Sequence, residues 1–311
     1  ERQRHIILNL RITTMISSAH KKPDLIKADW EIDFYSRPIL DENGKKRWEL
    51  LISSTNNFKG NQTFKWEKIC PASTVNSIWL KDALEEAIKE ANLQGWDCPS
   101  VLRCWRSSMK TMIKRAADQI GIELISSRRT YSLLEWLLER ERNFYPRQKG
   151  YIGVNLAPPS NSLRNEPIPL PEEVRGDSWS FASLTINTLR EADEWEIEFS
   201  NLIPIKESLD DKFSIPGIRL FSSTRSLALA AWLGGLEPAK LVIEGKQIIL
   251  EAGQADRWLV TDVKEEAKNA INRNFLNTKQ NADGLQFISV QKSSEQNSLD
   301  GFWMLKDIGE I

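Results

Sequence analysis

Histidine is nearly absent from this sequence of 311 residues. Its two histidines, His5 and His20, both lie near the N-terminal end, and none follows them. Ser-His-Asp and Cys-His catalysis, histidine zinc sites and histidine general bases are therefore not expected in the rest of the chain. The sequence also lacks a Walker loop and a Gly-x-Gly-x-x-Gly segment, the two commonest glycine-rich phosphate-binding loops. Together these absences exclude many ordinary classes of enzyme.

Cysteine is scarce as well. The three cysteines, Cys70, Cys98 and Cys104, are odd in number, and no two of them have Cys-x-x-Cys spacing. This argues against a disulfide framework and against a zinc site, and it favours a reducing compartment. No apolar run approaches the roughly 20 residues that cross a bilayer, so no membrane span is expected. The sequence predicts no metal and no other cofactor.

Charge is balanced overall but unevenly distributed. The formal net charge is -1, from 42 Lys and Arg against 43 Asp and Glu. Residues 101–150 contain 11 basic and 5 acidic side chains, a net charge of +6, whereas residues 171–210 contain 3 and 10, a net charge of -7. A surface that binds phosphate groups is therefore expected in the first half of the chain.

Proline marks the division of the chain into domains. Six prolines lie within residues 146–177, a density at which neither a helix nor an inner strand can continue. We therefore expect a proline-rich linker at 146–177 between an N-terminal domain at 28–145 and a C-terminal domain at 178–311. Residues 1–27 are expected to form an N-terminal arm, either disordered or upstream of the true start of the protein.

The pattern of apolar residues predicts an α+β or α/β fold class. In the N-terminal domain a three-strand meander is followed by alternating helices and strands, which is the order of ribonuclease H-like folds. Along the first predicted strand Trp30, Ile32 and Phe34 share one face, whereas Glu31 and Asp33 share the other. The C-terminal domain is predicted to be a mixed α+β sheet domain.

Serines are expected to cap three helices of the N-terminal domain, the first of them at Ser77. Ser108 precedes one helical segment, and Ser132 with Glu135 has the spacing of a capping box at the next. Helix N-termini of this kind can receive phosphate oxygens.

A nuclease of the ribonuclease H-like class requires carboxylates on the first strand, the first helix and the fourth strand, which converge on two divalent ions. Asp33 would be the first of these, and Glu85 or Glu86 the second. The fourth strand, predicted at 101–105, contains an arginine and no acid. We therefore expect Asp33 to be structural, with a metal-dependent nuclease kept as an alternative.

Four segments of the chain resemble one known family. They are "WEIDFYSRPILDENGKKRWELLI" from Trp30, "SRRTYSLLEWL" from Ser127, "IPGIRLFSSTRSLALAAWLGGLEP" from Ile215 and "GFWMLKD" from Gly301. These segments closely resemble the Tab/Atab family of oxygenic phototrophs. The resemblance implies a non-catalytic RNA-binding protein that promotes translation of photosystem reaction-centre messages and photosystem biogenesis. The implied partner is RNA, in the 5′ regions of photosystem messages, with translation or assembly proteins as further partners.

The resemblance also implies a location and a C-terminal motif. Members of the family act in chloroplasts and have relatives in cyanobacteria, so the expected location is the cytoplasm of a cyanobacterium or the stroma of a plastid. The family's terminal Trp-Leu-Leu corresponds to Trp303, Met304 and Leu305, and replacing leucine by methionine nearly conserves volume. Trp303 is expected either in the core of a last strand or as an exposed anchor.

RNA outside a regular duplex is held by basic side chains on phosphates and by aromatic or guanidinium planes on bases. Clusters that combine both kinds of side chain lie near the ends of the predicted strands. The predicted RNA-binding residues are Tyr35, Arg37, Arg103, Trp105, Arg106, Arg128 and Arg129. A core position for Trp105 and a buried pair or solvated loop for the last two arginines stay open. A protein–protein assembly factor for photosystem subunits is a further alternative function, favoured by the low net charge and the acidic second domain.

Overall fold

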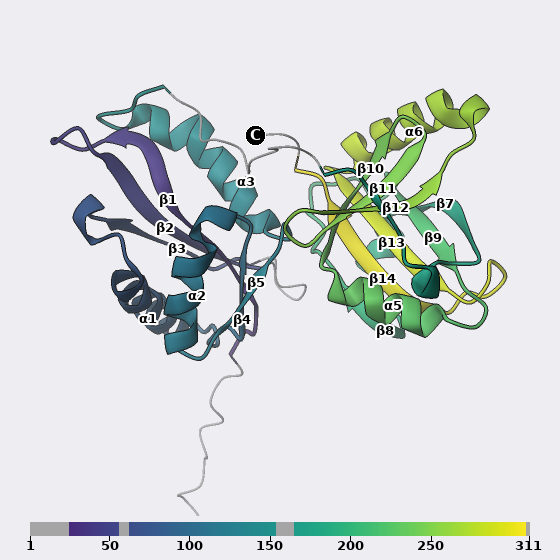
Figure 1. Cartoon of the computed structure of the whole chain (residues 1–311), viewed down its shortest axis with the longest axis horizontal. Helices are drawn as coiled ribbons and strands as arrows, with labels where there is room; N and C mark the ends of the chain where they lie inside the picture. Colours follow the sequence, from purple (N-terminus) through teal and green to yellow (C-terminus); the bar gives the residue numbers. More distant parts are fainter. Residues whose placement is uncertain (1–24, 56–61, 154–164, 309–311) are drawn as a thin grey trace, which may run out of the picture.

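The chain folds into two α+β domains that lie next to each other (Figure 1). The structure is a computed structural model, and it describes residues 25–55, 62–153 and 165–308. Most of the predicted N-terminal arm therefore lies outside the described residues. Among the helices that are described, none is long and apolar enough to cross a membrane.

The N-terminal domain is built on one five-stranded sheet. Its main elements are β1 (Trp30–Leu40), β2 (Lys46–Ser54), β3 (Lys65–Cys70), α1 (Ser77–Leu93), β4 (Val101–Cys104), α2 (Lys110–Gln119), β5 (Glu123–Ser126) and α3 (Tyr131–Glu139). The strand order is β3-β2-β1-β4-β5, in which β1, β2 and β3 pair antiparallel and β1, β4 and β5 pair parallel. This is the predicted meander followed by alternating helices and strands, and assignment to the ribonuclease H-like class stays a prediction.

Strand β1 separates an apolar face from a charged face. Trp30, Ile32 and Phe34 are fully buried in the core that includes α1 and α2. Glu31 and Asp33 point to the opposite face, because successive side chains of a strand alternate. Figure 1 shows α1 and α2 on one side of the sheet and α3 on the other. The charged face of β1 is therefore enclosed rather than open to solvent.

The predicted serine caps are wrong. Helix α1 is capped by Asn76, whose side chain accepts from two backbone N–H groups, and not by Ser77. Helix α2 follows Met109 and helix α3 follows Thr130, and neither residue makes a side-chain capping bond. Ser132 lies inside α3, where its hydroxyl is 2.7 Å from the hydroxyl of Ser53 on β2. Glu135 accepts a hydrogen bond from Lys306 in the other domain. Tertiary partners, rather than the helix terminus, bind these two side chains.

The C-terminal domain contains two sheets. Its main elements are β6 (Ile168–Pro169), β7 (Ser178–Thr185), α4 (Ile186–Arg190), β8 (Ile197–Asn201), β9 (Ser214–Phe221), α5 (Ser226–Gly235), β10 (Pro238–Glu244), β11 (Gln247–Ala252), β12 (Asp256–Asp262), α6 (Lys268–Asn281), β13 (Leu285–Gln291) and β14 (Leu299–Lys306). The larger sheet has the order β7-β9-β13-β14-β8, and the smaller has the order β10-β11-β12-β6. One face of the larger sheet packs against α5, α6 and the smaller sheet. The other face is partly covered by α4 and the segment that follows β8.

The predicted linker is attached to folded structure at both ends. Tyr151 bridges to Ile39 of β1, and Ile168 with Pro169 forms the short strand β6, which pairs with β12. Residues 154–164, between these attachments, lie outside the described residues. The domain boundaries predicted from proline density stay predictions.

The C-terminal motif lies in β14 and is buried. Trp303, Met304 and Leu305 expose 2%, 0% and 0% of their surface. Trp303 and Leu305 belong to the core under α5 and α6, and Met304 belongs to the core on the opposite face of the sheet. The structure thus places Trp303 in the core rather than at the surface as an anchor.

Candidate nucleic-acid interface

Asp33 is the centre of a buried ion-pair network. Its carboxylate accepts hydrogen bonds from Arg37 Nη1 at 2.8 Å and from Arg106 Nε and Nη2 at 2.8 and 3.3 Å. Burial alone would raise the pKa of Asp33, but the attraction of Arg37 and Arg106 outweighs it and holds the pKa below its ordinary value. The carboxylate is therefore charged, and both of its oxygens are bound by arginine.

This arrangement does not resemble a two-metal nuclease site. Two guanidinium groups occupy the positions at which ions would neutralise Asp33. The acids predicted to complete the site point elsewhere, since Glu85 pairs with Lys81 and Glu86 pairs with Lys68. No group of three metal-binding side chains is found in the described ranges. The contacts make Asp33 a structural residue that joins β1 to the end of β4.

The network continues along the same face of the sheet. Arg37 Nε lies 3.3 Å from Glu49 Oε2, which also accepts a hydrogen bond from Tyr145 Oη at 2.8 Å and lies 3.3 Å from Arg140 Nη2. Burial raises the pKa of Tyr145 to about 12, so the phenol stays a donor. Arg37 and Arg140 thus lie among protein acceptors rather than on an open basic surface.

Aromatic rings enclose the guanidinium of Arg106. Its carbon lies 3.8 Å from the ring centre of Tyr35 and 4.1 Å from that of Trp105. Trp105 is 4% exposed and packs in the core under α3, and Tyr35 is half-buried. The rings predicted to stack on bases here stack on an arginine of the protein itself.

The remaining predicted arginines join the two domains. Arg128 donates to the Glu251 carboxylate at 2.8 Å and to two backbone carbonyls of the C-terminal domain, at 3.0 and 2.7 Å. Arg129 donates to the carbonyl oxygens of Pro238 and Met304 at 2.5 and 3.2 Å. Backbone groups make the contact as well, since the N–H of Arg128 donates to Gly253.

Arg103 connects three parts of the chain. It donates to Asp29 before β1 and to both carboxylate oxygens of Glu237, at 2.8 and 3.2 Å. Glu237 has a φ of 56°, which is unusual for a residue other than glycine, and it lies immediately before β10. The bidentate contact with Arg103 binds the carboxylate of Glu237 at the domain junction.

Helix α3 also crosses the junction. Tyr131, its first residue, donates its hydroxyl to the carbonyl of Ala239 at 2.5 Å and packs in a core of the C-terminal domain. Lys306 of β14 donates to Glu135 at 2.5 Å and to Asp283 at 2.8 Å. The two domains are therefore fixed to each other by ion pairs, backbone bonds and a shared apolar contact.

None of the seven predicted RNA-binding residues is fully exposed. Arg37, Trp105, Arg106 and Arg129 are buried, whereas the other three are half-buried. Their contacts with other groups of the protein account for their positions without reference to RNA. Direct contact with RNA by these residues stays a prediction.

Exposed cations of the basic segment lie elsewhere. Of its eleven basic residues, five contact protein acceptors or rings and the other six are exposed. Three of those six, Lys110, Lys114 and Arg115, lie on α2, whose opposite face is buried through Ile113 and Ala116. One helix therefore presents three cations to solvent, although Lys114 also pairs with Asp118 at 2.9 Å.

Glu31 is the second carboxylate buried on the charged face of β1. It accepts the N–H of Leu133 in α3 at 2.7 Å, and 3% of the residue is exposed. Burial raises the pKa of Glu31 from 4.5 to about 8, although the N–H of Leu133 and the charges of Arg103 and Arg129 act in the opposite direction. The folded protein therefore holds a proton that the unfolded chain releases.

The proton on Glu31 makes stability fall as the pH rises. Below about pH 4.5 the carboxyl of Glu31 is protonated in both the folded and the unfolded state, whereas between about 4.5 and 8 only the folded state keeps the proton. The stability that the protonated carboxyl contributes is therefore lost as the pH rises through 8. Glu31→Gln cannot ionise, so we expect its free energy of unfolding, relative to that of the parent, to be higher near pH 8 than near pH 5. Denaturant titrations across this range measure the difference. Asp33 and Glu237, whose pKa values are lowered, titrate below this pH range. Parallel pH profiles of stability for the parent and Glu31→Gln would contradict the raised pKa of Glu31.

Both domains match one family of known proteins. Residues 29–140 match the domain described as RNA-binding protein Tab2/Atab2 N terminal, and residues 157–306 match RNA-binding protein Tab2/Atab2, C-terminal domain. The predicted family resemblance is therefore confirmed over both halves of the chain.

Two plant proteins are similar over most of their length. The chloroplastic Protein TAB2 homolog of Zea mays is 33% identical over 296 residues, which cover 92% of this chain and 73% of that protein. The chloroplastic Protein TAB2 homolog of Arabidopsis thaliana is 32% identical over 295 residues, which cover 92% and 76%. A chain in the cryo-EM structure of a simian T-cell lymphotropic virus intasome with PP2A regulatory subunit B56 gamma covers 78% of this chain and 81% of its own, with 10% identity and a TM-score of 0.29. That likeness is too low to support an argument about fold or function. The two domain matches and the plant relatives together establish that the chain belongs to the Tab2/Atab2 family of RNA-binding proteins, which is not a family of enzymes.

Proposed function

We propose that this protein binds the 5′ regions of photosystem messages and promotes translation of the reaction-centre proteins they encode. Its membership of an RNA-binding family, through matches in both domains, is the observation that carries the proposal. The proposed location is the plastid stroma, or the cytoplasm if the source is a cyanobacterium, because the similar plant proteins are chloroplastic.

We infer that RNA lies along the N-terminal domain, near α2. Neutralisation of phosphate charge contributes most of the affinity of proteins for nucleic acid, and Lys110, Lys114 and Arg115 are the exposed cations gathered on that helix. The residues predicted from the sequence, which are Tyr35, Arg37, Arg103, Trp105, Arg106, Arg128 and Arg129, stay in this proposal as candidate RNA contacts. Their own charges are engaged by protein partners, so the exposed lysines and arginine of α2 are better placed to contact phosphates.

Removing the three α2 cations should weaken RNA binding and flatten its dependence on salt. A cation that no longer neutralises a phosphate lowers the slope of log affinity against log salt by roughly 1. The combined change Lys110→Ala, Lys114→Ala and Arg115→Ala should therefore lower the slope by about 2 to 3, the smaller value applying if the pair with Asp118 keeps Lys114 from RNA. Filter binding of single-stranded RNA at several salt concentrations measures affinity and slope together.

A matched control separates a binding surface from charge in general. Lys45, Lys46 and Lys89 are also exposed and also belong to the N-terminal domain, but they lie on the first hairpin and on α1. Their combined replacement by alanine removes the same charge and should leave the slope nearly unchanged. Equal effects of the two triple variants would rule out a localised α2 surface, and a parent protein that binds no RNA would rule out the proposed function itself. Crosslinking in cells, followed by sequencing of bound RNA, then tests whether photosystem messages are the targets.

A further inference from the structure

A cavity of about 740 Å³ opens on the larger sheet of the C-terminal domain. Its lining comes from β7, β9, β13 and β14, from Asn297 and Ser298 before β14, and from Trp195 and Glu196 before β8. It lies on the face of the sheet opposite the core under α5 and α6, because Ile288 and Val290 of β13 point into that core whereas Ser289 points into the cavity. Nothing in the proposed function near α2 uses this cavity.

Aromatic rings form one wall of the cavity. Phe287 and Phe302 stack with their ring centres 5.4 Å apart and their planes at 19°, and Trp195 lies edge-on against Phe302 at 5.2 Å. Gly217 of β9 is required by this packing, since a Cβ there would lie 2.4 Å from the ring of Phe287. Trp195 is only half-buried, so part of its surface is open to a planar ligand.

Arg219 of β9 supplies a positive charge to the cavity. Its Nε donates to the hydroxyl of Ser180 at 3.3 Å, and its guanidinium carbon lies 5.2 Å from the ring of Phe221. No carboxylate forms an ion pair with it within the described parts of the chain, in contrast to Arg37, Arg103 and Arg128. A half-buried arginine that pairs with no carboxylate of the described residues is suited to bind an anionic group.

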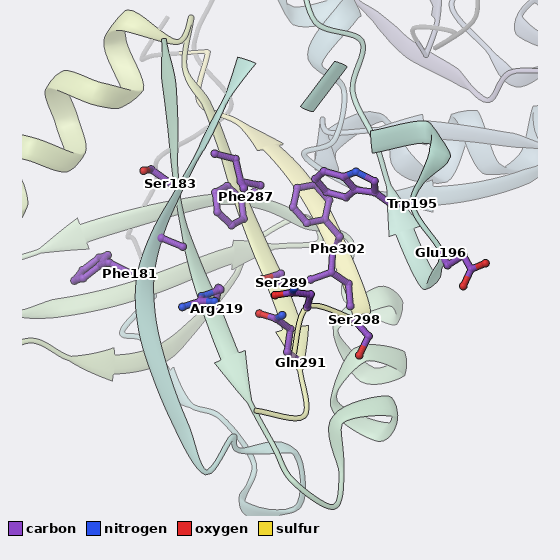
Figure 2. Close-up of a pocket in the computed structure, with 14 residues that line it drawn as sticks. Phe181, Ser183, Trp195, Glu196, Arg219, Phe287, Ser289, Gln291, Ser298 and Phe302 are labelled. Atoms are coloured by element: carbon purple, nitrogen blue, oxygen red, sulfur yellow. The ribbon is translucent and has the colours of Figure 1, made fainter. Parts of the chain in front are cut away.

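Gln291 of β13 supplies a polar group of fixed orientation. The residue is 4% exposed, and its Nε2 donates to the carbonyl of Gln296 at 2.8 Å. Because a carbonyl oxygen can only accept, this bond fixes which end of the amide is the nitrogen. The other end, Oε1, is buried and has no hydrogen-bond partner among the described residues. In Figure 2 Gln291 and Ser289 lie close together on β13, and Arg219 lies beside them on the neighbouring strand β9.

We propose that this cavity binds one nucleotide of a single-stranded RNA, with a phosphate at Arg219, the base against Trp195, and an N–H of the base directed to Gln291 Oε1. The proposal rests on the proposed RNA-binding function and adds a second contact region to it. A ribonucleotide combines the three features that the cavity matches, namely an anionic group, a planar ring and N–H donors at the ring edge. Glu196 lies on the opposite side of the cavity from Arg219 in Figure 2, which favours placement of the phosphate at the Arg219 end.

Ultraviolet crosslinking of the whole protein to a random-sequence single-stranded RNA, with mass spectrometry of the crosslinked peptides, tests this placement. Crosslinks are expected in the peptide that contains Trp195. Arg219→Gln should weaken binding about tenfold and lower the salt slope by roughly 1, whereas Arg219→Lys should keep the slope because it keeps the charge. Lys246→Gln, at an exposed turn outside the cavity, removes the same charge and serves as the control.

The outcomes separate this proposal from the function on which it rests. If the parent binds RNA but Arg219→Gln binds like the parent, or no more weakly than Lys246→Gln, the cavity is not an RNA site and the RNA-binding function stands. A parent that binds no RNA overturns both. If Arg219→Gln fails to fold by thermal melt, the crosslink map of the parent decides, and crosslinks confined to other surfaces overturn the cavity proposal.

Discussion

Replacing Asp33 with alanine should lower the free energy of unfolding by about 3–5 kcal/mol, because removing one partner of a buried ion pair leaves the other charge uncompensated. Asp33 is 0% exposed, and it is the carboxylate that pairs with Arg106 and one of two, with Glu49, that pair with Arg37. The loss of side-chain volume is small, so most of the effect is expected to come from charge. Urea or guanidinium denaturation, followed by tryptophan fluorescence, measures it.

Two comparisons make this test specific. Glu86→Ala breaks an ion pair with Lys68 whose side chains are 53% and 33% exposed, and its effect should stay below about 1 kcal/mol. The triple change Asp33→Leu, Arg37→Met and Arg106→Met replaces Asp33 and both of its arginine partners by apolar groups and should cost less than Asp33→Ala alone. If Asp33→Ala lowers the free energy of unfolding no more than Glu86→Ala does, the carboxylate of Asp33 does not stabilise the ion pairs on this face of the sheet.

The environment of Asp33 could be predicted only in part from the sequence. Alternation along β1 correctly separates Trp30, Ile32 and Phe34 from Glu31 and Asp33, because a strand has a fixed period of two. The missing acid on β4 also argues against a metal site, and that stays a prediction. The sequence does not indicate, however, that Arg106 turns back over Asp33, since that interaction depends on the parallel pairing of β1 with β4.

The domain junction could not be predicted, for the same reason. Arg103 and Arg128 look like a basic patch when only their neighbours in sequence are considered. Their acidic partners, Glu237 and Glu251, lie 134 and 123 residues further along the chain. The one signal in the sequence is the net charge of -1, which implies that a segment of +6 has acidic counterparts elsewhere. That signal does not identify which acids they are.

The segments that carry the family resemblance meet at this junction. Arg129, from the segment that begins at Ser127, donates to Pro238 at the end of the segment from Ile215, and also to Met304 in the segment from Gly301. These positions are far apart in sequence, yet a single guanidinium connects them. The match to the family over both domains is therefore consistent with a fixed arrangement of the two domains.

Replacing Trp303 with alanine should also lower the free energy of unfolding by about 3–5 kcal/mol, the range for removing a large aromatic ring from a core. The ring is 2% exposed and packs over Gly301 and Ala230. A Cβ at position 301 would lie 2.4 Å from this ring, so Gly301→Ala alone should destabilise through overcrowding.

The double variant distinguishes packing from a role in binding a partner. With Trp303 reduced to alanine, the methyl group of Gly301→Ala no longer meets the ring, so the second change should cost less in that background than in the parent. A core role therefore predicts a large single effect together with positive coupling between positions 301 and 303. An anchor role predicts that Trp303→Ala leaves denaturation unchanged while function in cells disappears. Because Trp303 is buried between β14 and α5, we expect the first result. The RNA affinity of Trp303→Ala, measured well below its melting temperature, should then remain close to that of the parent. The reason is that Trp303 points into the core under α5 and is part of neither the cavity lining nor α2.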